Sequence, residues 1–357
     1  MDRRERCLAV VSFVCFLIGV STKVLAQIQP PAELRPEPEI WLSPQALPLA
    51  PLNQDVDFMA MFAPGAPWNF AAAHTRVFKL HGSFVSHASQ EEINTVVADL
   101  SRRGIPIALE IGVMDVGTAK TGAPCGGLGR VEGYGTPADA EKISAIVKAA
   151  GGTLKYLSFD EPLYYGHYYD GPYACQSTIA AAFQLVIPTV NTYIQEFPDI
   201  IIGDNEPTNI AAYDGWREGL LEWATDFLVT FKRPFAFMQL DIPWANGPPS
   251  KEPEDALAFY HYVRMLQRQG LYERVGIIID GTPDDSSDAA WVEDARHHVL
   301  LLESTYGLRP DQDLFESWNV HPTHALPETR PDTLTSLIPW YFEPDVEALT
   351  GRGGPVP

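Results

Sequence analysis

The stretch with the clearest potential for chemistry runs from Lys155 to Tyr169. Its first half alternates apolar with other residues, as a strand does, and ends in the adjacent carboxylates Asp160 and Glu161, after which Pro162 stops the strand. A tyrosine-rich loop follows. Carboxylates move protons or stabilise a cationic transition state, and flat aromatic rings stack on sugar faces. The pattern fits a carbohydrate-processing site, although an acidic turn that merely closes a buried strand has the same appearance.

The rest of the chain offers a regular series of elements to position these residues. Runs expected to form strands span residues 56–63, 76–80, 105–111, 154–159, 200–203, 235–240, 275–279 and 314–318. They are apolar almost throughout, as strands buried on both faces of a parallel sheet are, and helical segments with caps separate them. Eight strand–helix units in one run predict a closed (β/α)8 barrel. An open doubly wound sheet is the rival, but no glycine-rich nucleotide fingerprint follows any strand.

The ends of the chain suggest export. Residues 1–26 have the pattern of a secretory signal peptide, with basic residues, an apolar run from Cys7 to Val20, and Val24-Leu25-Ala26 before the expected cut. An uncleaved anchor is the alternative, although the run is short for a membrane span. We expect residues 27–53 to form a proline-rich arm and residues 54–350 to form one barrel domain. The predicted location is secreted or periplasmic.

Charge narrows the range of partners. The 357 residues carry a formal net charge of -21, and the leader removes four basic and two acidic side chains, which leaves -23. So acidic a protein does not attract nucleic acid or an anionic membrane, and suits a neutral or cationic substrate. We expect a monomer without a cofactor, acting on a poly- or oligosaccharide.

Side chains suited to chemistry gather where the strands end. In (β/α)8 barrels the active site lies at the carboxyl ends of the strands. Those ends carry acids, tryptophans and histidines: Trp68, His81, Glu110, Asp160, Glu161, Asp204, Glu206, Asp241, Trp244, Asp280, Glu316, Trp318 and His321. The opposite ends carry ordinary solvated residues. Since most of these acids have no Lys or Arg beside them in sequence, we expect mutual repulsion to raise some of their pKa values, as general-acid catalysis requires.

These strand-end motifs resemble those of the barrel glycoside hydrolases, particularly the large retaining clan. That clan has Asn-Glu-Pro or a near variant after strand four and a carboxylate nucleophile after strand seven. Asp160-Glu161-Pro162 and Asp280 occupy the two places, so the resemblance implies that Glu161 is the general acid/base. A literal Asn205-Glu206-Pro207 follows the fifth expected strand, one strand late. If the strand count is off by one, the acid would be Glu206 and the nucleophile Glu316.

We therefore expect Glu161 to protonate the leaving oxygen, with Glu206 or Asp280 as nucleophile or base. The side chains expected to contact sugar are Trp68, His81, Glu110, Asp160, Tyr164, Tyr165, Asp204, Asp241, Trp244, Trp318 and His321. The sequence leaves open the sugar, the linkage, the stereochemistry and the endo or exo mode.

Two other kinds of protein share parts of this pattern. A metal-dependent barrel hydrolase or isomerase could use His81, His321 and His324 with Glu110 or Asp280, although His321-Pro-Thr-His324 matches no helix-borne zinc signature. A barrel that binds carbohydrate without cleaving it would carry similar aromatic side chains. The expected ligand set contains no metal.

Two cysteines remain after the leader is removed. Cys125 lies in the loop after the third expected strand and Cys175 in the loop after the fourth. Consecutive barrel strands are neighbours, so these loops rise side by side, and an oxidising compartment favours a bond between them. We predict a Cys125–Cys175 disulfide that holds the loop of residues 164–173 over the cleft; two free thiols are the alternative.

Overall fold

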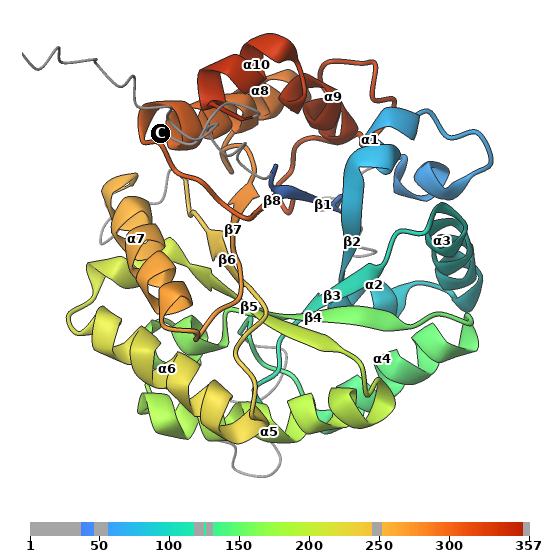
Figure 1. Ribbon diagram of the computed structural model, residues 1–357. Coiled ribbons are helices and arrows are strands. Elements are labelled where there is room, and N and C mark those ends of the chain that lie inside the picture. The colour runs from blue at the N-terminus through green and yellow to red at the C-terminus, as the bar shows by residue number, and fades with distance from the viewer. Residues whose placement is uncertain (1–36, 46–55, 118–124, 126–130, 245–251, 353–357) are drawn as a thin grey trace, which may run out of the picture.

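The computed structural model describes residues 37–45, 56–117, 125, 131–244 and 252–352, and its eight parallel strands close into a barrel (Figure 1). The strands are β1 (Glu39–Ser43), β2 (Thr75–His81), β3 (Ile107–Ile111), β4 (Leu154–Asp160), β5 (Ile201–Pro207), β6 (Met238–Asp241), β7 (Val275–Ile279) and β8 (Gln312–Glu316). Each pairs with the next in sequence, and β8 pairs with β1 to close the ring. The predicted (β/α)8 fold is confirmed.

Helices surround this barrel on the outside (Figure 1). They are α1 (Asn69–His74), α2 (Gly82–His87), α3 (Gln90–Arg103), α4 (Pro137–Ala149), α5 (Ile179–Glu196), α6 (Trp216–Phe231), α7 (Glu254–Arg268), α8 (Asp288–Val299), α9 (Leu337–Tyr341) and α10 (Pro344–Thr350). A capping box at Ser89 and Glu92 begins α3, and Thr136 caps α4 in the same way. Within the described ranges, no helix is long and apolar enough to cross a membrane.

The first strand is not where the sequence suggested. Residues 56–63 contain the short 3-10 helix η1 (Phe58–Phe62), and β1 lies instead inside the segment expected to be a proline-rich arm. Phe58, Met61 and Phe62 are the buried residues of η1, at spacings of three and four, which is a helical period. The remaining seven strands match their expected places. The strand count therefore stands, and Glu161 follows β4 whereas Glu206 lies on β5.

Alternate side chains of each strand fill the barrel. The interior cluster consists of Trp41, Val77, Ala108, Phe237, Ile278 and Leu314, with Tyr156 packed against it. Gly203 of β5 has no side chain because there is no room: a Cβ there would lie 2.1 Å from the ring of Phe237. Successive strand residues point to opposite faces, so residues two and four positions beyond each cluster member also point inward. This alternation decides which strand-end residues reach the cavity.

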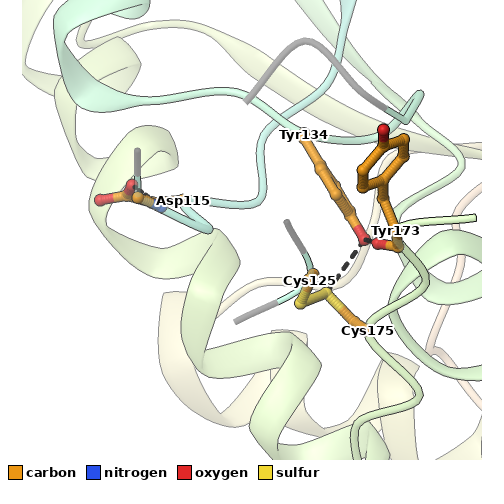
Figure 2. Close-up of a disulfide and its surroundings, with 6 residues drawn as sticks. Asp115, Cys125, Tyr134, Tyr173 and Cys175 are labelled. Carbon is orange, nitrogen blue, oxygen red and sulfur yellow. Dashed lines mark hydrogen bonds between the residues drawn. A yellow bond between two sulfur atoms is a disulfide. The ribbon is translucent and has the colours of Figure 1, made fainter. Parts of the chain in front are cut away.

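The predicted disulfide is present. Cys125 and Cys175 are bonded, with their Cα atoms 4.4 Å apart (Figure 2). The hydroxyl of Tyr134 donates a hydrogen bond to the carbonyl oxygen of Tyr173 at 3.1 Å and lies 3.0 Å from the sulfur of Cys175. The bond thus fastens the β4 loop to the segment that follows β3. The predicted signal peptide lies outside the described residues.

We expect the disulfide to matter for stability. It closes a loop with a sequence separation of 50 residues, for which the chain-entropy estimate is roughly 4 kcal/mol, less any strain. The double variant Cys125→Ser/Cys175→Ser should unfold at a lower denaturant concentration while keeping the circular dichroism of the barrel. An unchanged unfolding midpoint, or two titratable thiols at these positions in the unreduced protein, would contradict this.

Candidate active site

A cavity of about 520 Å³ opens at the carboxyl ends of the strands. Its wall combines carboxyl, amide and aromatic side chains with short backbone segments. Most of the side chains expected to form a site line it: His81, Glu110, Asp160, Glu161, Tyr164, Tyr165, Asp241, Trp244, Asp280 and Trp318, together with Glu316. The structure therefore brings together residues from strands or loops that are distant in sequence.

The floor of the cavity is a buried ion-pair network around Lys79. This side chain has no solvent exposure, and its ammonium contacts the carboxylates of both Glu110 and Glu316, the latter at 2.5 Å. His81 lies between the same two acids, with Nε2 3.1 Å from Glu316 and Nδ1 3.5 Å from Glu110. Ser43 donates a hydrogen bond to Glu316 at 2.9 Å. Two basic and two acidic groups thus balance within the network.

The charges of this network fix its protonation. Burial alone would lower the pKa of Lys79, but Glu110 and Glu316 outweigh that effect and raise it to about 12. Burial opposes ionisation of Glu316 as well, yet Lys79 and His81 lower its pKa to about 2. The pKa of His81 is raised, because Glu316 and Glu110 outweigh its burial. At neutral pH the floor therefore holds a charged lysine and an ionised Glu316.

Above the floor, Glu161 and Asp241 form a carboxyl pair. Both side chains line the same cavity, and the charge of Asp241 is the strongest electrostatic influence on Glu161. Burial, followed by the charge of Asp241, raises the pKa of Glu161 well above its usual value. Burial and the charges of Glu316 and Glu110 raise the pKa of Asp241 to about 7. The pair therefore holds a proton near neutral pH, which is the state needed for general-acid catalysis.

The backbone at Glu161 is unusual. Its φ angle is 53°, in the left-handed region that non-glycine residues seldom adopt. Its amide donates a hydrogen bond to the carbonyl oxygen of Asn205 on β5 at 3.0 Å, which helps to hold this conformation. The turn directs the side chain toward Asp241 and the cavity, and only 8% of Glu161 is exposed. Strained residues of this kind are found at functional sites.

Two further acids face the cavity without a basic partner in the described residues. Asp160 and Asp280 both line it, and Asp280 is only 1% exposed. Burial raises the pKa of both groups well above the usual value; neighbouring Glu132 and Glu110 add to this for Asp160, and Asp241 and Glu316 for Asp280. These carboxyls are therefore poorly ionised unless a ligand compensates their charge.

Aromatic side chains complete the wall. Tyr164 and Tyr165 begin the π-helical turn η4 (Tyr164–Tyr168), a form of helix that is frequent at functional sites. The hydroxyl of Tyr165 donates a hydrogen bond to Glu132 at 3.0 Å. Trp244 stacks on the ring of His298, with centroids 3.6 Å apart, and lines the cavity as Trp318 does. Flat rings beside carboxyl groups are suited to binding sugars.

The Glu206 motif does not reach the cavity. Asn205 and Pro207 line it, so Asp204 and Glu206, which alternate with them on β5, point outward. Glu206 is fully buried and accepts hydrogen bonds from the amides of Leu163 and Tyr164, at 2.7 and 2.9 Å. Asp204 accepts one from the indole of Trp223 at 2.8 Å. The expected roles of Glu206 in catalysis and of Asp204 in sugar binding do not fit these positions, and both side chains anchor the surrounding elements instead.

Trp68 and His321 also lie away from the cavity. Trp68 is fully buried in the hydrophobic core, where its indole donates a hydrogen bond to the carbonyl oxygen of Met61 at 2.7 Å. His321 lies 2.6 Å from Asp288, which His324 also contacts. These positions do not fit the expected sugar contacts, because a tryptophan enclosed on all sides cannot stack on a ligand and His321 contacts a carboxylate outside the cavity wall.

The floor is the place where the described residues could hold a metal ion. His81, Glu110 and Glu316 offer ligand atoms that all lie within 4.8 Å of one another. The ammonium of Lys79 contacts both of these carboxylates, however, so a divalent cation would be forced beside a buried positive charge. This donor set fits an ion-pair network organised by lysine better than it fits a metal.

Several residues of the site were not expected from the sequence. Lys79 lies within an apolar strand, and only its spacing of two from Val77 and from His81 indicates that it points inward. Asn205 donates a hydrogen bond to Glu110 at 3.1 Å, but its neighbour in the Glu-Pro motif was the expected site residue. Gln45 and Glu132 lie in connecting segments, where no periodic pattern places them.

Stability should depend on pH through these acids. In the folded protein the pKa of Asp241 is raised from 3.8 to about 7, so the unfolded chain loses this proton first and stability falls as pH rises between these values. Glu316 acts oppositely: its pKa is lowered from 4.5 to about 2, so its contribution is lost as pH falls through that range. We expect the melting temperature to be highest near pH ~4 and lower at pH ~8.

The variant Asp241→Asn provides the comparison for this prediction. It should reduce the difference between the two melting temperatures, because the amide has no proton to lose. An equally large difference in the variant would show that other groups cause the pH dependence.

Removing the ammonium should destabilise the barrel strongly. The variant Lys79→Met leaves two carboxylates buried near each other, and breaking a buried ion pair in this way costs about 3–5 kcal/mol. Denaturant unfolding measures the loss, and Lys155→Met, an exposed lysine on β4, is the matched control. A further change of Glu316→Gln should restore part of the stability. If Lys79→Met were as stable as the control, the network would not have the role assigned to it.

Comparisons with known proteins return structural likenesses at low sequence identity. The sequence matches no protein-family model and no curated protein. Among solved structures, a thermostable mutant of a xylanase from Cellvibrio japonicus is similar at 11% identity and a TM-score of 0.47, over 80% of this chain and 87% of that one. A GH53 catalytic domain from Ignisphaera aggregans has 10% identity and a TM-score of 0.42, over 72% and 76%.

An aldo-keto reductase of the silkworm Bombyx mori is similar at 11% identity and a TM-score of 0.43, over 90% of this chain and 86% of that one. All three TM-scores lie below 0.5, so these likenesses establish nothing about the chemistry of this chain.

Proposed function

We propose that this chain is an exported glycoside hydrolase that cleaves a poly- or oligosaccharide, with Glu161 as the proton donor. The observation that carries this proposal is the Glu161–Asp241 carboxyl pair, which holds a proton in an aromatic-walled cavity. Glycosidic cleavage needs one protonated and one ionised carboxyl group on either side of the bond. A pair that shares one proton supplies both.

We assign the second role to Asp241 rather than to Asp280. Asp241 is partly exposed and is the strongest electrostatic influence on Glu161, whereas Asp280 is not among the main influences on that residue. We expect a retaining reaction, in which the two carboxyl groups stand roughly 5–5.5 Å apart and the second carboxylate attacks the sugar directly.

The reaction then proceeds in two steps. Glu161 gives its proton to the glycosidic oxygen as that bond breaks, and the Asp241 carboxylate forms a bond to the anomeric carbon. Glu161, now ionised, takes a proton from a water molecule, whose oxygen displaces Asp241 from the sugar.

Export rests on two features. The amino-terminal segment has the pattern of a signal peptide, and the Cys125–Cys175 disulfide is of the kind that persists in oxidising compartments. After cleavage the protein would act outside the cytoplasm, as enzymes that degrade polymeric glycans do. We retain the expectation of a monomer without a cofactor.

The variant Glu161→Gln tests the proposal. Against a broad panel of polysaccharides we expect the wild-type protein to release reducing sugar and the variant to lose about 10²–10⁴-fold in kcat, because the amide cannot donate the acidic proton. Glu206→Gln is the matched control, since it changes the second Glu-Pro motif outside the cavity; it should lower the melting temperature but keep most of the kcat.

Two results would contradict the assignment. Full activity of Glu161→Gln would remove this residue from catalysis. Activity that is lost on chelation and restored by a divalent metal would instead favour a metal-dependent hydrolase using His81, Glu110 and Glu316.

A further inference from the structure

The charge of the cavity is unbalanced above its floor. Glu110 and Glu316 have their counter-charges in Lys79 and His81. Five more acids line the cavity: Glu132, Asp160, Glu161, Asp241 and Asp280. Among the described residues none of these five forms an ion pair with a lysine or arginine, and no lysine or arginine lines the cavity wall. These surplus acidic groups are therefore available to a ligand that brings positive charge.

Among these acids, Asp280 is the one whose surroundings indicate where a ligand would bind. It follows Ile278 by two residues, and Ile278 belongs to the interior cluster, so Asp280 points into the barrel. It is 99% buried, and neither carboxyl oxygen has a hydrogen-bond partner. The indole of Trp244 and the backbone of Asp280 lie close enough to oppose the rise of its pKa, but neither makes a hydrogen bond of good geometry. A buried carboxyl left without donors is costly and is a place where a ligand gains by donating.

The position of Asp280 indicates which part of a sugar it would meet. Asp280 follows β7 and lies near enough to Asp241, at the end of the paired strand β6, for the two charges to affect each other. If Asp241 attacks the anomeric carbon, the ring atoms next to that carbon are C2 and the ring oxygen. Only C2 bears a substituent, so we assign Asp280 to the substituent at C2. A hydroxyl at C2 donates one hydrogen bond and carries no charge. A protonated amine donates three and also compensates the surplus acids.

We propose that the substrate of this cavity is a glycan of 2-amino sugars with free, protonated amines, whose ammonium group is bound at Asp280. This inference rests on the proposed function and deepens it from a carbohydrate in general to a cationic one. Aromatic side chains beside the acids, Trp244 in particular, add cation–π attraction for the same group. The formal charge of -21 draws a cationic polymer toward the protein at low salt.

Glucosamine, N-acetylglucosamine and glucose test this proposal, because they differ only at C2 and require no choice of linkage. Their dissociation constants are measured by NMR titration with the full mature protein at mildly acidic pH, where the amine is protonated. We expect glucosamine to bind about tenfold more tightly than either neutral sugar, and the preference to shrink in high salt. Equal or weaker binding of glucosamine, or no binding of any of the three sugars, would overturn the proposal.

The variant Asp280→Asn locates the amine. It should reduce the preference for glucosamine toward one, whereas Asp284→Asn, an exposed acid of the same loop, removes the same charge and should leave the preference intact. A preference that survives Asp280→Asn would overturn the assignment to this residue. If Asp280→Asn does not fold, the wild-type ratio and its salt dependence still decide whether the ligand is cationic.

Failure here is distinguishable from failure of the proposed function. Turnover of neutral polysaccharides without any preference for amines would contradict the amino-sugar substrate but support the proposed hydrolase. A clear preference for glucosamine in a protein that cleaves no glycan would support binding of an amine but contradict the proposed hydrolase.

Discussion

The buried ammonium of Lys79 is the interaction on which the chemistry of the cavity depends. It holds Glu110 and Glu316 together in a place where two like charges could not otherwise lie. With that floor neutralised, the acids above it are raised in pKa by burial and by one another, without a basic group near enough to ionise them.

The alternation of strand residues separates functional from structural acids. Glu161 and Glu206 have the same sequence context, an acid before proline at the end of a strand. One leaves β4 through a left-handed turn into the cavity, and the other stays on the outer face of β5 and binds two backbone amides. The local sequence cannot distinguish the two residues, because β4 ends one residue before Glu161 whereas β5 continues through Glu206. The sequence predicted that acids gather at this end of the barrel, but not which face each occupies.

The elements that the sequence did predict are those with strong periodicity. Seven strands overlap the ranges that the residue pattern predicted, and capped helices lie between them, since apolar runs and caps are local signals. The first strand was missed because five residues between Pro38 and Pro44 resemble an extended arm. Only closure of the ring against β8 gives that segment its partners. Lys79 was missed for a related reason: its partners come from strands 31 and 237 residues further along the chain.

The buried acids of the cavity lower the stability of the folded protein, and the rest of the barrel offsets this loss. Each buried carboxyl without a counter-charge makes the folded state less stable at high pH, and four of them line one cavity: Asp160, Glu161, Asp241 and Asp280. Such an arrangement is retained only where a large core and a closed sheet supply the difference. A cationic ligand would reverse the penalty, because its ammonium makes ionisation of these acids favourable in the bound state. Ligand binding and folding stability are then coupled through the same carboxyl groups. At neutral pH a cationic ligand should therefore stabilise the folded protein more than a neutral one.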